Sequence, residues 1–247
     1  MLLSNSGNFI YLKTHKTGST AAEFALIPYC APPNHKEGQK RKETLISSYG
    51  IVGARNSGDK SKRANNNFFW HHMNAKAVIE RIGEEKFFSF NRVACIRNPF
   101  RKLVSQFYFR YRYKNNLLKP PDTLEETRSH FEDFLFTAKR RRFDTDSKEI
   151  DYHYKPRSDI NVVMYQGKII ITHFIRCEFL FSDLRDFCIN SNLDTKLLIS
   201  NNLRDNTASK KFNHKDLFYT KELINRAIEL EGWVFDAGKY SKDPSKA

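Results

Sequence analysis

The stretch that decides the fold is Asn8–Ile27, whose sequence is NFIYLKTHKTGSTAAEFALI. Its segment Asn8–Leu12 is a short apolar, β-branched and aromatic run, which is typical of a buried strand. A polar turn that contains Gly18 follows, and residues 21–27 form an alanine-rich apolar run that predicts a helix ending before Pro28. A strand, a glycine-containing turn and a helix form the opening half of a βαβ unit.

Strands and helices alternate through the rest of the chain. We expect helices over residues 74–82, 100–111, 124–139, 179–191 and 221–233, and strands over residues 45–52, 87–96 and 168–174. This alternation predicts an α/β fold: a three-layer sandwich with a central parallel sheet and a P-loop-like, phosphate-binding strand-loop-helix. Such sheets bind ligands at the carboxyl ends of their strands.

The length of 247 residues suits a single domain over residues 1–247, with a core large enough to fold without metals or disulfides. Two basic insertions interrupt it, near residues 31–67 and 114–160, and we expect the first to be a mobile loop.

The 40% hydrophobic content excludes a wholly disordered chain. A net charge of +14 indicates an anionic partner, such as nucleic acid, acidic lipid or an anionic cofactor and substrate.

The cysteines and the N-terminus bear on the compartment. The four cysteines form no C-x-x-C pair and no zinc-finger spacing, which favours a reducing environment and no metal site. The N-terminus carries no signal peptide, and no apolar run approaches the roughly 20 residues that span a bilayer. We therefore expect a cytoplasmic protein without a transmembrane segment, or a lumenal one if this sequence is part of a longer chain.

The loop Lys13–Thr20, with the sequence KTHKTGST, has the composition of an anion cradle. Gly18 permits close backbone approach, and the helix that follows directs its N–H groups and its positive dipole end toward the loop. Lys16 adds a positive charge, and three hydroxyl groups add hydrogen bonds. The loop is not a Walker A motif, because its lysine precedes the glycine. An ordinary capped turn remains the alternative.

The segment Val93–Ser105, with the sequence VACIRNPFRKLVS, carries a second anion-binding pattern. Arg97 leaves the end of a predicted strand, where its guanidinium can bind phosphate oxygens in a forked geometry. Ser105 lies about two helical turns further on and could reach the same anion. Taken alone, the pattern is better explained by a surface ion pair for Arg97 and an exposed Ser105.

Together the two segments resemble the PAPS-dependent sulfotransferases, where PAPS is 3′-phosphoadenosine 5′-phosphosulfate. Residues 16–20 (KTGST) resemble the 5′-phosphosulfate loop of that family, and residues 97–105 resemble its 3′-phosphate motif. Weaker similarities lie in residues 176–180 (RCEFL) and in the basic segment 203–211. The carbohydrate sulfotransferases, including the glycosaminoglycan 2-O-sulfotransferase type, are the most similar group.

The resemblance implies that PAPS is the co-substrate and that no metal is needed. Lys16 would be catalytic at the bridging oxygen, while Arg97 and Ser105 would hold the 3′-phosphate. The cofactor-binding residues that we expect are Lys13, Lys16, Thr17, Gly18, Ser19, Thr20, Arg97, Ser105, Arg204, Lys210 and Lys211. The sequence departs from the family pattern at Lys102, where the family usually has arginine, so a bidentate contact there would be lost.

Sulfuryl transfer to a hydroxyl also needs a base, and histidine suits this role near neutral pH. In related sequences a histidine precedes the helix before the 3′-phosphate strand, and His72 occupies that position. We expect His72 to be the catalytic base, with His15 as the second candidate. The alternative is that His71 and His72 only pack at a helix entrance beside Trp70.

The resemblance and the charge favour a hydroxyl acceptor on a carbohydrate, anionic or neutral, and no specific nucleic acid. Two other classes remain open. A nucleotide-dependent phosphotransferase predicts a Walker-type lysine and a carboxylate for magnesium. A non-enzymatic nucleic-acid-binding protein predicts binding that weakens steeply with salt.

Overall fold

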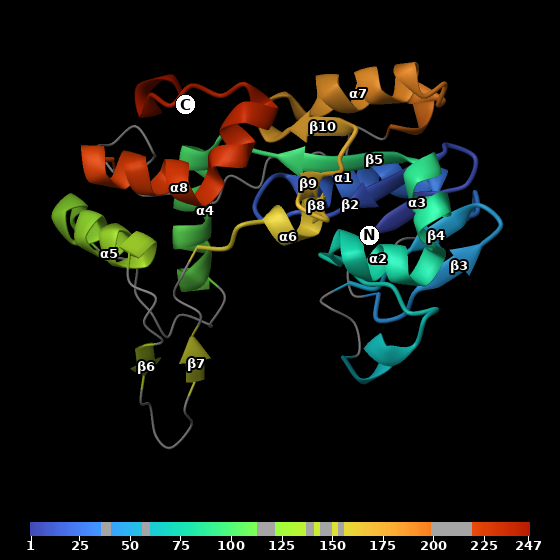
Figure 1. Ribbon diagram of the computed structural model, residues 1–247, viewed down its shortest axis with the longest axis horizontal. Coiled ribbons are helices and arrows are strands. Elements are labelled where there is room, and N and C mark those ends of the chain that lie inside the picture. Colours follow the sequence, from blue (N-terminus) through green and yellow to red (C-terminus); the bar gives the residue numbers. More distant parts are fainter. Residues whose placement is uncertain are drawn as a thin grey trace. The chain divides into compact units, whose positions relative to one another are not determined.

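The computed structural model describes residues 1–35, 41–55, 60–112, 122–136, 141–143, 150–152, 156–198 and 219–247. The chain divides into two compact units, each assembled from two separate segments (Figure 1). Unit 1 contains residues 1–97 and 159–206, and unit 2 contains residues 98–158 and 207–247. We expected a single domain, and the two units are described one at a time below.

Unit 1 is built on a six-stranded sheet with the strand order β10-β5-β2-β1-β4-β3. Its strands are β1 (Leu2–Ser4), β2 (Phe9–Leu12), β3 (Leu45–Ser47), β4 (Gly50–Val52), β5 (Asn91–Ile96) and β10 (His173–Arg176). A separate hairpin pairs β8 (Met164–Tyr165) with β9 (Lys168–Ile169). The helices of unit 1 are α1 (Ser19–Leu26), α2 (Ala75–Ile82), α3 (Glu84–Ser89), α6 (Ile160–Val163) and α7 (Leu180–Asn190). Short 3₁₀ turns occupy Ile27–Tyr29, Lys60–Ala64, Cys177–Phe179 and Thr195–Leu197.

The sheet is mixed, so the α/β class is confirmed while the expectation of a parallel sheet is corrected. Parallel pairing joins only β10 to β5 and β5 to β2. The pairs β2–β1, β1–β4 and β4–β3 are antiparallel, which makes the sheet mostly antiparallel. The reason lies in the connections, because β1–β2 and β3–β4 are joined by short turns that reverse the chain, whereas parallel pairing needs a longer crossover.

Strand β2 lies inside the sheet and is fully buried. Phe9 and Tyr11 face α1 and α7 in the main hydrophobic core, whereas Ile10 and Leu12 alternate to the opposite face and are buried as well. The hydroxyl of Tyr11 donates to the backbone oxygen of Ser19 at 2.9 Å. This bond ties the end of β2 to the start of α1 and fixes the loop between them.

Several predicted elements of unit 1 are confirmed and others are corrected. The helix over residues 74–82 is α2, capped by Asn74, whose side chain accepts from the backbone N–H of Ala77. The first half of the predicted strand 87–96 is helical instead, because two glutamates at the start of α3 favour a helix there. The predicted strand 168–174 is divided between β9 and β10. Within the predicted loop 31–67, the strands β3 and β4 extend the main sheet.

Unit 2 packs three helices around an aromatic core. These are α4 (Pro99–Arg112), α5 (Leu124–Phe136) and α8 (Lys221–Gly238), and a 3₁₀ turn (Pro244–Lys246) lies near the end of the chain. Two further strands, β6 (Arg141–Phe143) and β7 (Ile150–Tyr152), pair with each other. The rings of Phe107 and Phe131 meet edge to face at 5.3 Å, and the hydroxyl of Tyr219 donates to the backbone oxygen of Phe100 at 2.8 Å.

Candidate functional site

The candidate site in unit 1 is the loop between β2 and α1, at the carboxyl end of β2. Two of its residues adopt the left-handed backbone region, Lys16 with φ 60° and Gly18 with φ 73°. Gly18 is the N-cap of α1, and no side chain caps the helix there. The side chains of Cys177 and Leu180 lie against Gly18, where a Cβ would be 3.0 Å from Sγ of Cys177, so the P-loop-like character of this loop stays a prediction.

Hydrogen bonds within the loop explain its shape. The hydroxyl of Thr14 donates to the backbone oxygen of Cys95 on β5 at 2.6 Å and lies 2.7 Å from the hydroxyl of Thr17. The hydroxyl of Ser19 donates to the backbone oxygen of Thr14 at 2.5 Å. Thr17 and Ser19 are buried, so their hydroxyls shape the loop, whereas Thr20 is exposed.

Lys13 is engaged in a buried ion-pair cluster. Its ammonium group lies 2.5 Å from Oε2 of Glu23, and the guanidinium of Arg55 lies 2.7 Å from the same oxygen. Arg41 lies 3.8 Å from the other carboxylate oxygen. These cations hold the pKa of Glu23 at about 2, although burial alone would raise it. The expected contact of Lys13 with a cofactor stays a prediction, and the structure gives the side chain a role in fixing α1 beneath the loop.

Arg97 lies beside the loop. Its Nη1 donates to the backbone oxygen of Lys16 at 3.4 Å, so the predicted 3′-phosphate arginine and the predicted 5′-phosphosulfate lysine are neighbours. In the described part of the chain, the buried Nε of Arg97 has no hydrogen-bond acceptor. The buried Nε atoms of several other arginines share this feature, so the position of Arg97 beside the loop is what distinguishes it.

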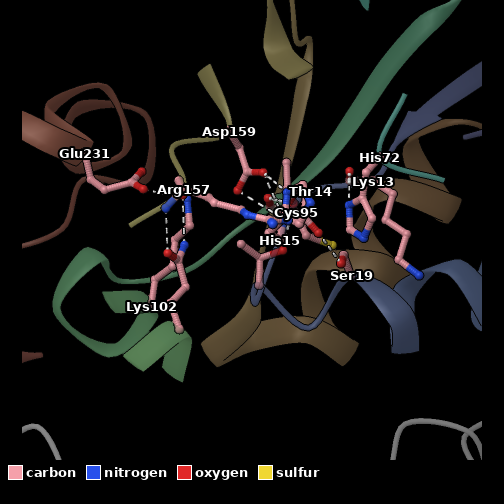
Figure 2. A network of polar contacts seen from close by, with 12 residues as sticks. Lys13, Thr14, His15, Ser19, His72, Cys95, Lys102, Arg157, Asp159 and Glu231 are labelled. Carbon is pink, nitrogen blue, oxygen red and sulfur yellow. Dashed lines mark hydrogen bonds and ion pairs between the residues drawn. The ribbon is translucent and has the colours of Figure 1, made fainter. Parts of the chain in front are cut away.

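Three histidines gather near the same loop, and Figure 2 labels two of them, His15 and His72. The rings of His15 and His72 stack with their centroids 3.8 Å apart and their planes 12° from parallel. The ring of His71 lies 4.7 Å from that of His72. Nδ1 of His72 donates to the backbone oxygen of Lys13 at 2.9 Å, so the predicted base does reach the loop across 59 residues of sequence.

Burial keeps the two neighbouring histidines neutral. Desolvation, together with the nearby His15, His71 and Lys13, lowers the pKa of His72 to about 2. Desolvation likewise lowers the pKa of His71 to about 3, with Lys13 adding to the effect. Both rings are therefore neutral imidazoles at physiological pH, and such a ring can accept a proton only through a nitrogen that carries none.

Asp159 is the residue that the sequence did not single out. Its carboxylate is 1% exposed and accepts from the backbone N–H of His15 at 3.0 and 3.1 Å. One of its oxygens also lies 2.6 Å from Nδ1 of His15. Asp159 falls within the predicted irregular insertion 114–160 and is 144 residues from His15, so no pattern in the sequence joins the two.

Ser105 and Lys102 both lie on α4 in unit 2. Asn98 Oδ1 accepts from the backbone N–H groups of Phe100 and Arg101 at 3.1 and 3.4 Å, so Asn98 and Pro99 start the helix. Ser105 is partly exposed on that helix. Lys102, where the sequence departs from the family pattern, is buried and lies 2.8 Å from Glu231. The structure thus gives Lys102 a role inside the core of unit 2.

The remaining predicted residues lie outside the described residues. These are Arg204, Lys210 and Lys211. Within the described ranges, no group of three or more histidine, cysteine or acidic side chains could hold a metal ion. No helix in that part of the chain combines the length and the apolar character needed to cross a membrane.

All four cysteines are free thiols, and three of them are buried. Burial raises the pKa of the Cys95 thiol, beneath the loop, to about 12, so it stays protonated. It packs as a small apolar side chain.

Comparisons with protein-family models, with curated proteins and with solved structures found no match.

Proposed function

We propose that this protein is a sulfotransferase that moves a sulfuryl group from PAPS to a hydroxyl group of a carbohydrate. The observation that carries the proposal is the pairing of Arg97 with the Lys16 loop, where a buried guanidinium nitrogen lacks an acceptor among the described residues. An anion with several oxygens satisfies both the loop and this nitrogen.

The roles follow from charge and position. Lys16 neutralises charge on the bridging oxygen of the leaving group, and the start of α1 with Gly18 binds the 5′-phosphosulfate. Arg97 binds a phosphate, which the sequence resemblance assigns to the 3′ position. The loop-forming hydrogen bonds of Thr14, Thr17 and Ser19 keep this surface in place before any ligand binds.

The reaction is an in-line displacement at sulfur. The acceptor oxygen forms the new S–O bond, the bond to the bridging oxygen breaks, and 3′,5′-adenosine bisphosphate leaves. The acceptor proton goes to a histidine of the stacked pair His15–His72, the two bases that the sequence offers. The cations Lys16 and Arg97 supply the neutralisation that a metal provides in many phosphoryl transfers.

The test is a calorimetric titration with 3′,5′-adenosine bisphosphate, beside AMP and ATP–magnesium. We expect tight binding of the bisphosphate, weak binding of AMP, and a loss of at least about tenfold in affinity for Lys16→Ala and Arg97→Ala. The matched controls are Lys76→Ala on α2 and Arg185→Ala on α7, which remove the same charges from exposed positions in the same unit. They should bind as the wild type does.

Three outcomes would overturn the proposal. A stronger affinity for ATP–magnesium would favour the phosphotransferase alternative. Equal affinity for AMP and the bisphosphate would show that no 3′-phosphate is recognised. Equal losses in the control and site variants would show only a general effect of net charge, as expected for a polyanion-binding protein.

A further inference from the structure

Asp159 holds His15 at two points. Its carboxylate accepts from the backbone N–H of His15 and also lies 2.6 Å from the ring nitrogen Nδ1. Asp159 stands directly before α6, where an aspartate ordinarily caps the helix, yet its side chain makes no capping bond there. The carboxylate instead contacts His15, in a loop that lies 144 residues earlier in the sequence (Figure 2).

This contact fixes which nitrogen of His15 carries the proton. An ionised carboxylate can only accept hydrogen bonds, so Nδ1 of His15 must donate and therefore bears the hydrogen. The lone pair of the neutral ring is then at Nε2. The side chain of His15 is 27% exposed, so this lone pair belongs to a ring that solvent and ligands can reach, whereas the carboxylate behind it is 1% exposed.

His72 supports the same ring from its face. It stacks on His15 at 3.8 Å and is anchored by its own bond to the backbone oxygen of Lys13. The stack therefore fixes the plane of the His15 ring. Of the two rings, only His15 has a carboxylate against its Nδ1, and that carboxylate stabilises the imidazolium form.

We propose that His15 is the catalytic base and that Asp159 is the positioning residue that orients it. This inference rests on the proposed sulfuryl transfer. The acceptor O–H gives its proton to Nε2 of His15 as the acceptor oxygen bonds to sulfur and the bridging oxygen leaves. Asp159 keeps its charge and stabilises the new imidazolium. His72, which stacks on the face of the His15 ring, keeps that ring in its orientation.

The groups that set the basicity of His15 come from three elements. Asp159 lies before α6, His72 and His71 lie before α2, and Lys13 and Lys16 belong to the same loop as His15. Asp159 favours the protonated ring, and the lysines and the stacked ring oppose it. Removal of the carboxylate should therefore move the acidic limb of the rate profile to lower pH.

The test compares Asp159→Asn, His15→Gln and His72→Gln. Transfer of labelled sulfate from PAPS is measured on whichever of chondroitin, desulfated heparin or a β-galactoside oligosaccharide the wild type modifies. We expect a fall of kcat on the order of 10²–10⁴-fold for His15→Gln and of about tenfold or more for Asp159→Asn. The acidic limb should disappear in the first variant and move to lower pH in the second. His72→Gln should keep its acidic limb.

Binding of 3′,5′-adenosine bisphosphate separates this inference from the proposed function. It should stay within about twofold of wild type in all three variants, since none removes a phosphate-binding charge. If the wild type does not bind the bisphosphate, the proposed function fails. If the wild type binds and transfers but His15→Gln keeps its kcat and acidic limb, the present inference fails alone.

A second measurement needs no acceptor. Nitrogen-15 spectra of the histidine rings report which ring nitrogen is protonated. We expect His15 in the Nδ1–H form in the wild type and a change of that form in Asp159→Asn, whose amide can donate as well as accept. A wild-type His15 protonated at Nε2 would overturn the inference, even where none of the three glycan probes is sulfated.

Discussion

The ammonium group of Lys102 lies 2.8 Å from Oε1 of Glu231, and each side chain is 1% exposed. The two residues are 129 positions apart, on α4 and α8. Glu231 has non-helical dihedral angles (φ −130°, ψ 21°) in the middle of α8. The pair therefore joins two helices of unit 2 at the point where one of them is kinked.

Loss of one partner of this pair should destabilise the fold strongly. Lys102→Met or Glu231→Leu alone should cost about 3–5 kcal/mol, because each leaves a buried charge without its counterion. The double variant should lose much less than the sum of the two. Urea unfolding of the four proteins, analysed as a double-mutant cycle, measures the coupling. Strictly additive losses would contradict the pairing.

The cluster around Glu23 predicts a specific loss of stability in acid. Its pKa is lowered from 4.5 to about 2 in the folded protein, so the unfolded chain binds the proton more readily. The stabilisation is complete above pH 4.5 and disappears as the pH falls toward 2. Glu23→Gln should cost about 3–5 kcal/mol at pH 7, since Lys13 and Arg55 lose their buried counterion.

Urea unfolding at a series of pH values checks the prediction for Glu23. The difference between wild type and Glu23→Gln should shrink steadily from pH 4.5 downward. A difference that stays constant to pH 2.5 would show that the carboxylate does not titrate as described. Glu80→Gln on the exposed face of α2 is the matched control and should change stability by less than about 0.5 kcal/mol at any pH.

Gly18 and Gly83 allow backbone strain to be separated from steric contact. Both have positive φ, 73° and 89°, so an alanine at either position is strained. A Cβ at Gly18 would also lie 3.0 Å from Sγ of Cys177, whereas a Cβ at Gly83 meets nothing within 4 Å. Gly18→Ala should therefore lose roughly 1–2 kcal/mol by strain plus a further loss from the contact, and Gly83→Ala only the strain.

Thermal and urea unfolding of the two alanine variants supply this comparison. The bisphosphate affinity should fall in Gly18→Ala and not in Gly83→Ala, because only the first glycine lies in the proposed cradle. A bisphosphate affinity that falls equally in both variants would contradict the placement of Gly18 in the cradle.

The stacked histidines predict a second acid effect, which begins at higher pH. The pKa of His72 falls from 6.5 to about 2 on folding, so below pH 6.5 the unfolded chain takes up a proton that the folded protein does not. Stability should decline from pH 6.5 downward. His72→Asn, which suits the left-handed backbone at φ 57°, should reduce this slope between pH 6.5 and 5. An unchanged slope, measured by urea unfolding, would contradict the assignment.

Local signals made much of the fold predictable. Asn74 and Gly83 mark both ends of α2, and Asn98-Pro99 marks the start of α4, because capping is a property of a few consecutive residues. The strand β2 and the helix α1 follow from the same short stretch that opens the sequence. The strand order could not be predicted from the sequence. The strand β1 is only three residues long, and it carries no alternation of apolar and polar residues by which to recognise it.

The candidate site was only partly predictable for a similar reason. Lys16, Arg97 and His72 were found because each lies in a short pattern with its own chemistry. The carboxylate that pairs with Lys13 belongs to Glu23 on α1. The carboxylate that contacts His15 belongs to Asp159, directly before α6. Such pairings depend on tertiary structure, and no spacing in one sequence reports them.

The left-handed backbone of Lys16 and His72 has an evolutionary consequence. A side chain with φ near 60° costs roughly 1 kcal/mol that glycine does not pay. A glycine in place of Lys16 should therefore lose little stability or gain some, whereas a glycine in place of His72 would also remove the bond to the backbone oxygen of Lys13 and the stack on His15. A library screened only for thermal tolerance should accumulate glycine or asparagine in place of Lys16, and one screened for turnover should retain the lysine. The two screens would therefore favour different residues in place of Lys16. Deep mutational scanning under both selections would measure how much thermal stability this lysine costs.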